Sequence, residues 1–265
     1  MPDIVRIEHL KRRDEGLLRE LGRELRRFFL PENADYVIVD ADYSQIELRL
    51  LAHVSGDANM IRAFREGVDV HTSTAATVFG VDEDAVTSEM RKRAKAVNFG
   101  IMYGIGAFSL ADDIGVSRPQ AQEFIDRYLA GYPGIDAYLK NTIRQAYEDG
   151  YVTTLYGRRR YIPELSGTNK MQQKFGERVA MNSPIQGTAA DIIKVAMVRV
   201  DRKLKESGLD ARLILQVHDE LLIEAHRSCA EEARRILKAE MEGALLCSVP
   251  LDVDIHVGDT WFDAK

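Results

Sequence analysis

Carboxylates stand at the ends of apolar segments in two distant parts of the chain. Asp42 follows the apolar residues 36–41, and Asp219 and Glu220 lie at the tip of a hairpin expected over residues 212–225. Side chains at such points are held by rigid backbone and still reach solvent. Mg²⁺ is typically bound by one or two carboxylates with substrate phosphates and water, and two such ions can stabilise the attacking and leaving oxygens of an in-line displacement. Since aspartate is also common in turns, spacing alone leaves both a metal site and ordinary turn chemistry open.

Cationic and aromatic residues recur at intervals of four in a second set, formed by Arg91, Lys95, Phe99 and Tyr103. On a helix this spacing places them along one slowly drifting stripe. A stripe that is cationic for two turns and aromatic for two more can hold a triphosphate at one end and a base at the other. The alternative is a solvated basic turn that runs into a pair of core aromatic side chains.

The elements that must position these residues are strands near both ends of the chain and helices in its middle. A cap at Thr87 and the Ser117–Gln120 pattern mark helix starts, and Gly150 and Gly208 mark helix ends. Residues 6–29 predict one or two short charged helices. Strands are expected over residues 36–41, 151–155, 212–217, 221–225 and 251–257, and helices over 45–52, 88–98, 117–129, 134–149, 170–183, 188–206 and 230–245. This order predicts an α+β fold, a small sheet domain with a helical insertion between its first strand and its later hairpin.

Composition indicates a soluble globular protein. The chain has 265 residues, of which 45% are hydrophobic and 29% charged, enough for one large domain or two small ones. No apolar run approaches the ~18 residues of a membrane span, and no secretory signal is visible. Cys229 and Cys247 lack metal-ligand spacing and are interpreted as reduced thiols. We therefore expect a cytoplasmic protein without a membrane partner.

The charge distribution leaves a nucleic-acid partner open. A net charge of −6 argues mildly against one, because phosphate binding draws on Lys and Arg. The basic residues are clustered, however, and net charge is a poor guide to a local field. Clusters lie at residues 91–95, 158–160 and 170–178, away from the acidic residues 82–84 and 231–242.

Three segments resemble, in order, the motifs of family A DNA polymerases, the bacterial DNA polymerase I type. They are residues 42–49 (DYSQIELR), residues 91–104 with the pattern RxxxKxxxFGxxYG, and residues 216–220 (QVHDE). Residues 71–75, 156–161 and 182–187 match further family segments. Together these segments cover essentially residues 23–265.

The resemblance implies an antiparallel palm sheet with a helical fingers insertion. Residues 22–55 and 179–265 would form the two parts of the palm, and residues 56–178 the fingers. Residues 1–21 would be an N-terminal helical segment without a family match. The helical thumb, a Thr-Gly-Arg-Leu-Ser-Ser segment and an exonuclease domain of the longer family enzymes have no counterpart. A trimmed palm-and-fingers portion and a natural minimal relative both remain open, and we favour the first.

The resemblance also implies roles for individual residues. Two Mg²⁺ ions, with Mn²⁺ as an alternative, would be held by Asp42, Asp219 and the backbone carbonyl of Tyr43, with Glu220 as a supporting acid. Arg91, Lys95 and His71 would meet the incoming triphosphate, and Lys95 could protonate the pyrophosphate leaving group. The remaining nucleotide contacts would come from Phe99 against the sugar and base, Tyr103 beside the template-pairing position, Glu47 at the 2′ position, and Gln45. Arg178, Asn182, Gln186 and His218 would contact the primer–template.

The predicted function is that of a template-directed DNA polymerase core. It would add deoxynucleotides to a primer 3′ end with release of pyrophosphate, as a weakly processive monomer whose partners are primer–template DNA and dNTP. An inactive nucleotide- or DNA-binding fragment of such a polymerase is the main alternative. A polymerase of the related single-subunit RNA type is a second, which Glu47 together with Phe99 disfavours.

Overall fold

The computed structural model describes residues 21–265, and it divides the chain into two compact units. The first unit contains the described part of Met1–Ser44 together with Ile193–Ala244 and Asp252–Lys265. The second contains Gln45–Ile192 and Leu245–Leu251. The chain therefore leaves the first unit after its first strand and returns to it for the later strands, as the order of predicted elements indicated.

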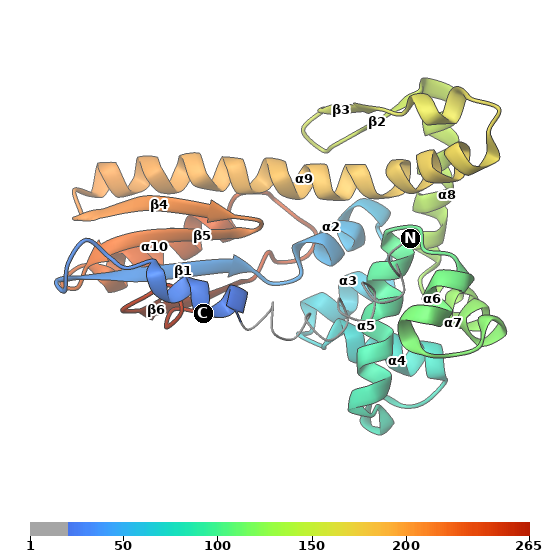
Figure 1. The fold of residues 1–265 in the computed structure, drawn as a ribbon, viewed down its shortest axis with the longest axis horizontal. Coiled ribbons are helices and arrows are strands. Elements are labelled where there is room, and N and C mark those ends of the chain that lie inside the picture. The colour runs from blue at the N-terminus through green and yellow to red at the C-terminus, as the bar shows by residue number, and fades with distance from the viewer. Residues whose placement is uncertain (1–20) are drawn as a thin grey trace, which may run out of the picture. The chain divides into compact units, whose positions relative to one another are not determined.

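A four-stranded antiparallel sheet forms the centre of the first unit (Figure 1). Its strand order is β4-β5-β1-β6, and the α+β class with an antiparallel sheet is confirmed. The strands are β1 (Tyr36–Tyr43), β4 (Ala211–Val217), β5 (Glu220–His226) and β6 (Val253–Gly258). Strand β1 extends beyond the residue at which we expected it to end, so Asp42 lies within the strand rather than after it. The extension arises because Asp42 pairs on both sides, with Glu220 and with Asp254.

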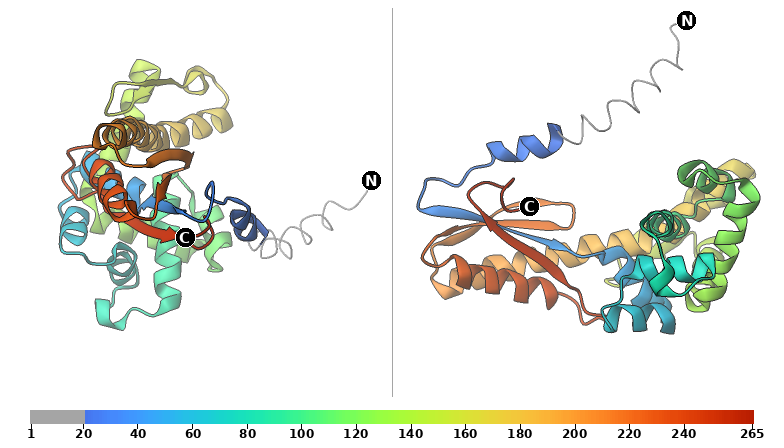
Figure 2. Two further views of the ribbon diagram at one scale, coloured as in Figure 1. Left: turned by 90° about the vertical axis from the view of Figure 1, so that its left-hand side faces the viewer. Right: turned by 90° about the horizontal axis from the view of Figure 1, so that it is seen from below.

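The two faces of this sheet are covered differently, because successive side chains of a strand point to opposite faces. On one face helix α10 (Ala230–Glu242) packs against β1, β5 and β6, and the Tyr43 hydroxyl donates to the Met241 carbonyl at 2.6 Å. Figure 2 shows the strands of this sheet with helix α10 alongside them. On the other face Ile38 and Leu222 pack with Trp261 of the C-terminal turn. Residues two and four positions after Ile38, Asp40 and Asp42, share this second face.

Helix α9 (Lys170–Ser207) contributes to both units. It is one helix of 38 residues, although Pro184 led us to expect two helices. A proline removes one hydrogen bond of the helical ladder and strains the preceding turn. Here apolar residues on both sides of Pro184 are fully or almost fully buried, with Ala180 before it and Ile185, Ile192 and Ala196 after it. Their burial holds the helix together across the proline.

The second unit contains seven further helices and a short hairpin in addition to the first part of α9 (Figure 1). Thr87 caps α5 and a complete Ser117–Gln120 capping box opens α7, so the local signals of both helix starts are confirmed. The helices are α2 (Ile46–Ser55), α3 (Ala58–Arg65), α4 (Val70–Phe79), α5 (Ser88–Met102), α6 (Ala107–Ile114), α7 (Arg118–Gly131) and α8 (Pro133–Asp149), and the hairpin is β2 (Tyr151–Thr153) with β3 (Arg159–Tyr161). Short 3₁₀ turns lie at Leu25–Phe28, Glu83–Ala85 and Pro163–Ser166.

The helical reading of residues 6–29 falls mostly outside the described residues. Residues 21–28 are helical and agree with it. Within the described residues 21–265, no helix is both long enough and apolar enough to cross a lipid bilayer.

Candidate active site

The pairing of β1 with β5 brings the two predicted aspartates to the same end of neighbouring strands. Asp42 lies opposite Glu220, and the backbone N–H of Tyr43 donates to the carbonyl of Asp219 at 3.3 Å. His218, with a φ of 53°, adopts a left-handed conformation in the turn that joins β4 to β5. This tight turn lets the chain reverse immediately before Asp219, so both aspartates are fixed by the backbone of the sheet.

A lysine ammonium occupies the acidic end of this sheet. Lys265 Nζ lies 2.7 Å from Asp42 Oδ2, 2.8 Å from Glu220 Oε2 and 3.7 Å from Asp40 Oδ2. Glu220 also accepts a hydrogen bond from Trp261 Nε1 at 2.5 Å. Neither Asp40 nor Lys265 was among the predicted site residues. Asp40 could have been found from the alternation of the strand, since it stands two residues before Asp42.

Glu220 does not reach solvent, which corrects the expectation for the hairpin tip. It is 5% exposed because it is the first residue of β5, paired on both sides and covered by Trp261. Burial works against ionisation of Glu220, but the hydrogen bonds from Lys265 and Trp261 outweigh it and lower its pKa. At Asp40, burial and then the neighbouring Glu220 carboxylate raise the pKa to about 8.

The donor set fits Mg²⁺ held jointly with a substrate. No three His, Cys, Asp or Glu side chains among residues 21–265 form a complete metal cage. Mg²⁺ does not require one, because one or two carboxylates with substrate phosphates and water commonly suffice. Asp42 and Glu220 already share one cation, the ammonium of Lys265. That ammonium therefore marks the position as one that attracts positive charge.

In the second unit, helix α5 carries most of the predicted nucleotide-binding stripe. Arg91, Lys95 and Phe99 lie on the helix, and Tyr103 is its C-cap residue. Arg91 and Lys95 are exposed. The rings of Phe99 and Tyr103 are stacked, with centroids 6.3 Å apart and planes inclined by 22°. The cationic end and the aromatic end of the stripe are thus both present.

Asp69, which was not predicted, holds the guanidinium of Arg91. Arg91 donates from Nε to Oδ1 at 3.1 Å and from Nη2 to Oδ2 at 2.7 Å. The same carboxylate caps helix α4 by accepting from the backbone N–H of Thr72. Partial burial opposes ionisation of Asp69, but these hydrogen bonds outweigh it and lower its pKa to about 2. The helix-start pattern of an aspartate three residues before a threonine was the available sequence signal.

His71 is buried and uncharged. Thr74 Oγ1 donates to Asn98 Oδ1 at 3.1 Å, so the amide nitrogen of Asn98 faces His71 Nδ1, also at 3.1 Å. Nδ1 therefore accepts and Nε2 carries the proton. Burial, with the positive charges of Arg91 and Lys95, lowers the pKa of His71 to about 4. His71 is thus available as a neutral hydrogen-bond donor.

Three of the predicted residues meet around the Tyr103 hydroxyl. It donates to Glu47 Oε2 at 2.6 Å, and the Gln186 side chain also hydrogen-bonds to it. Burial, followed by the bond to Glu47, raises the pKa of Tyr103 to about 12. The phenol therefore stays protonated and holds the Glu47 carboxylate in place.

A cavity of about 510 Å³ lies beside the aromatic end of the stripe, and Phe99, Tyr103 and Arg178 line it. Gly104 also lines it, with a φ of 69°. A Cβ at Gly104 would lie 2.2 Å from Met181 Cε and 2.9 Å from Arg178 Cγ. Both the backbone conformation and the close approach of α9 therefore require glycine at this position.

Two other predicted residues carry buried oxygens without a hydrogen-bond partner among the described residues. The two atoms are Oε1 of Gln45 and Oδ1 of Asn182. The backbone of Gln45 has a φ of 54°. Both belong to the second unit. Buried polar atoms usually have partners, so each of these oxygens marks a position that water or a ligand can complete.

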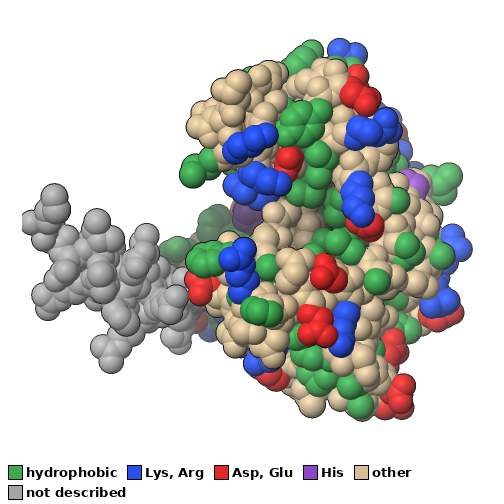
Figure 3. Space-filling model, turned by 90° about the vertical axis from the view of Figure 1, so that its right-hand side faces the viewer, with side chains coloured by type: hydrophobic (Ala, Val, Ile, Leu, Met, Phe, Trp, Pro, Cys, Tyr) green, Lys and Arg blue, Asp and Glu red, His purple; other side chains and the backbone are tan. Residues whose placement is uncertain are grey.

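Part of the basic cluster at residues 158–160 is engaged in contacts within the protein. Arg158 forms an ion pair with the buried Asp191, which also accepts from Thr154 Oγ1 at 2.8 Å. The guanidinium of Arg159 lies 4.7 Å from the ring centroid of Tyr151. Figure 3 shows Lys and Arg side chains interspersed with Asp and Glu on one face, without one continuous basic patch.

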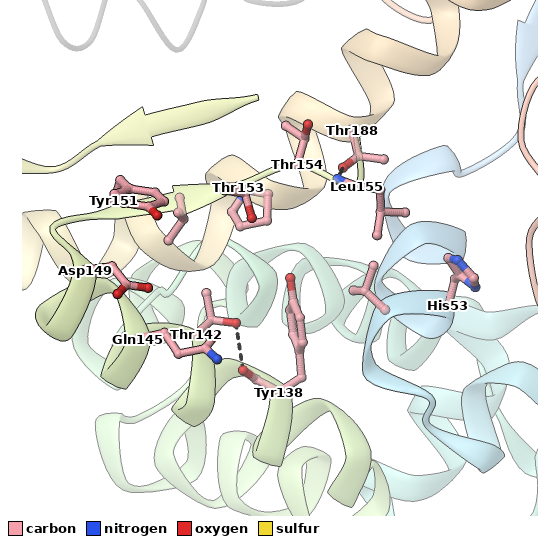
Figure 4. A pocket seen from close by; sticks show the side chains of 13 residues that line it. His53, Tyr138, Thr142, Gln145, Asp149, Tyr151, Thr153, Thr154, Leu155 and Thr188 are labelled. Carbon is pink, nitrogen blue, oxygen red and sulfur yellow. Dashed lines mark hydrogen bonds between the residues drawn. The ribbon is translucent and has the colours of Figure 1, made fainter. Parts of the chain in front are cut away.

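A further cavity of about 450 Å³ is lined by residues of α2, α8, β2 and α9, and none of them is a predicted site residue (Figure 4). Two of its hydroxyl groups bond to backbone groups of the protein. Thr142 donates to the Tyr138 carbonyl at 2.9 Å, and Thr188 accepts from the backbone N–H of Leu155 at 3.1 Å. These contacts assign the cavity wall a structural role.

Comparison with known proteins shows which family this chain resembles in sequence and in fold. Residues 9–263 match the profile of the family described as DNA polymerase family A, and the match begins inside the segment 1–21 that we expected to lack one. The chain is 52% identical over 246 residues to DNA polymerase I of Bacillus caldotenax and 53% identical over 246 residues to that of Bacillus subtilis (strain 168). Each alignment covers 93% of this chain and 28% of the relative. The fold is similar to that of the POL domain of Pol1 from M. smegmatis in complex with DNA primer-template and dNTP, with a TM-score of 0.87 and 43% identity over 92% of this chain and 43% of that chain.

Proposed function

Because this chain belongs to DNA polymerase family A, we propose that it carries the nucleotidyl-transfer centre of a template-directed DNA polymerase. It would extend a primer 3′ end by one deoxynucleotide at a time and release pyrophosphate. The observation that carries the proposal is the β1–β5 pairing. It sets Asp42 opposite Glu220, the residue after Asp219, and Asp42 already contacts the cationic Lys265.

The first unit would supply the metal ligands. Asp42, Asp219 and the carbonyl of Tyr43 would hold two Mg²⁺ or Mn²⁺ ions, with Glu220 as a supporting acid. When bound, the ions would stabilise the attacking and leaving oxygens. Sheet pairing fixes the backbone at Asp42 and Glu220, so this part of the backbone would need little reorganisation when the site is loaded.

The second unit would supply the nucleotide contacts. Arg91 and Lys95 are exposed cations suited to phosphate oxygens, and Lys95 would also protonate the leaving pyrophosphate. His71 would donate from Nε2 as a neutral group, since its Nδ1 accepts from Asn98. His71 would therefore give the phosphate a directional hydrogen bond, and Arg91 and Lys95 would supply the positive charge.

The aromatic end of the stripe would receive the sugar and base. Phe99 offers a face for stacking, and Tyr103 would lie beside the template-pairing position. Glu47, held by Tyr103, would exclude a 2′-hydroxyl and so select deoxynucleotides. The unpartnered oxygens of Gln45 and Asn182 support a site that substrate completes. Asn182, Arg178, Gln186 and His218 would contact the primer–template, and such contacts position DNA without reading its sequence.

The main alternative is a module that binds nucleotide or DNA without turnover. The relatives are far longer than this chain, which spans 28% of their length, so parts outside the alignment could be needed for catalysis. A binding module and a polymerase differ in whether the carboxylates of the first unit matter for product formation.

Single-nucleotide primer extension with Mg²⁺ tests the proposal. We expect Asp219→Ala to reduce the rate at least about 100-fold, because it removes a group positioned for the charge that develops in the transition state. Asp201→Ala, an exposed aspartate of α9 that pairs only with Lys205 in the described structure, is the matched control and should retain the rate of the unaltered protein.

Equal product from Asp219→Ala and the unaltered protein would remove the two-metal proposal. Absence of product from the unaltered protein, with dNTP binding retained, would instead support the binding module.

A further inference from the structure

The ammonium of Lys265 lies against the Asp42 carboxylate, the group that would hold a metal ion. Its Nζ contacts Asp42 Oδ2 at 2.7 Å and Glu220 Oε2 at 2.8 Å. The Lys265 side chain is 29% exposed, so it reaches into the acidic cluster from the surface. The contact joins residues 223 positions apart in the chain and ties the C-terminal turn to the end of β1.

The Lys265 ammonium reduces the repulsion among the acidic side chains around it. Asp40 is 2% exposed and Glu220 is 5% exposed, and both lie on the same face of the sheet as Asp42. Like charges in a buried cluster repel strongly unless a counter-ion is present. Lys265, 3.7 Å from Asp40 and closer to the other two carboxylates, is that counter-ion in the metal-free protein.

A divalent ion and the Lys265 ammonium would repel each other if both were bound to the carboxylates of Asp42 and Glu220. Mg²⁺ binds carboxylate oxygens at ~2.0–2.1 Å, so an ion on Asp42 Oδ2 would lie within a few ångströms of Nζ. Two positive charges at such a separation repel strongly even at the effective dielectric of a partly buried site, about 20. Metal binding and the Lys265 contact therefore oppose each other.

We propose that Lys265 is a resident counter-ion that competes with divalent metal for Asp42 and sets the metal affinity of the nucleotide-free protein. This inference rests on the proposed function, because it takes Asp42 to be a metal ligand. The ammonium stabilises the empty carboxylate cluster and must leave Asp42 when metal arrives. Metal accompanied by triphosphate, which brings its own ligands and negative charge, would displace Lys265 more readily than metal alone.

Binding of Mn²⁺ to the nucleotide-free protein, followed by electron paramagnetic resonance of the free ion, tests the inference without any turnover. Lys265→Gln removes the charge and keeps a polar side chain, and we expect it to bind Mn²⁺ at least about tenfold more tightly. Lys265→Arg keeps the charge and should bind Mn²⁺ like the unaltered protein. Asp42→Ala, in both the unaltered and the Lys265→Gln background, identifies the binding that depends on this site.

A second variant guards against loss of folding, since Lys265→Gln leaves the buried carboxylates without their counter-ion. Lys265→Gln combined with Asp40→Asn removes the positive charge together with the buried carboxyl of Asp40, and it should also bind Mn²⁺ more tightly. Thermal unfolding gives an independent readout, because a ligand that binds only the folded state raises the Tm. Mn²⁺ should raise the Tm of both glutamine variants more than that of the unaltered protein.

The outcomes separate this inference from the proposed function. Mn²⁺ binding that depends on Asp42 but is equal in the unaltered protein and both glutamine variants would overturn the role of Lys265 and leave the metal site standing. Absence of Asp42-dependent Mn²⁺ binding in every variant would overturn both.

Discussion

At the scale of single residues, the predicted site residues are accompanied by partners that set their charge and direction. Asp69 holds Arg91, and Asn98 determines which nitrogen of His71 carries the proton. Lys265 neutralises the carboxylates beside Asp42. These partners lie elsewhere in the chain. The residue types of Arg91, His71 and Asp42 therefore indicated their chemistry, but not which groups pair with them or set their protonation.

Asp69 makes a pH-dependent contribution to stability. Its pKa in the folded protein, about 2, is below the ordinary value of 3.8. The stabilisation is therefore present above pH 4 and is lost as the pH falls toward 2. Both side chains of the Asp69–Arg91 pair are substantially exposed, at 37% and 46%, so solvent screening limits the effect to less than about 1 kcal/mol.

Asp69→Asn tests this contribution, because asparagine caps a helix as well as aspartate does and only the charge is lost. Urea unfolding from pH 3 to pH 7 should show the variant less stable at pH 5–7 and the difference shrinking below pH 4. Glu89→Gln, which breaks the exposed pair with Arg93, is the control for surface charge in the same unit. A stability difference independent of pH would contradict the assigned pKa.

At the scale of elements, the sequence predicted where helices and strands form, but several of them end at other residues than predicted. Helix α5 continues past Asn98 to Met102, and α9 continues through Pro184. Strand β1 includes Asp42 because it gains partners on both sides. In each case tertiary packing or pairing extends an element beyond the point at which its local signals weaken.

The end of α5 depends on Gly104. We expect Gly104→Ala to lower the free energy of unfolding by about 2–4 kcal/mol, from the cost of a positive φ plus a clash with Met181 and Arg178. Gly115→Ala is the matched control, because its φ is 65° and a Cβ there would meet nothing within 4 Å. It should cost only about 1 kcal/mol. Equal losses in urea unfolding would show that the close contact with α9 is unimportant.

At the scale of the whole molecule, charge limits how firmly DNA can be held. The net charge is −6, and several basic residues are engaged internally, among them Arg91 with Asp69 and Arg158 with Asp191. These paired cations are less available to replace the counter-ions of a DNA backbone. Binding that relies on a small number of phosphate contacts is weak and depends on salt.

We expect weak, distributive extension of primed template by this chain. Fluorescence anisotropy with a labelled primer–template should show binding that weakens as salt rises from about 50 to 200 mM. Extension with a trap of unlabelled DNA should then yield products only a few nucleotides long. Long products in the presence of the trap at moderate salt would contradict the argument from charge.

The sequence by itself determined the α+β class, most elements, the family motifs and which side chains could carry chemistry. Those signals are local: the apolar run around Val39, the cap at Thr87 and the four-residue spacing from Arg91 to Tyr103 depend on near neighbours in the chain. Only the tertiary structure decided which groups are buried, paired or neutral. Asp42 meets Lys265, Glu220 lies under Trp261, and Tyr103 holds Glu47 through contacts between residues far apart in sequence. Burial and Coulomb interactions depend on distance in space, and the spacing of residues along the chain does not specify that distance.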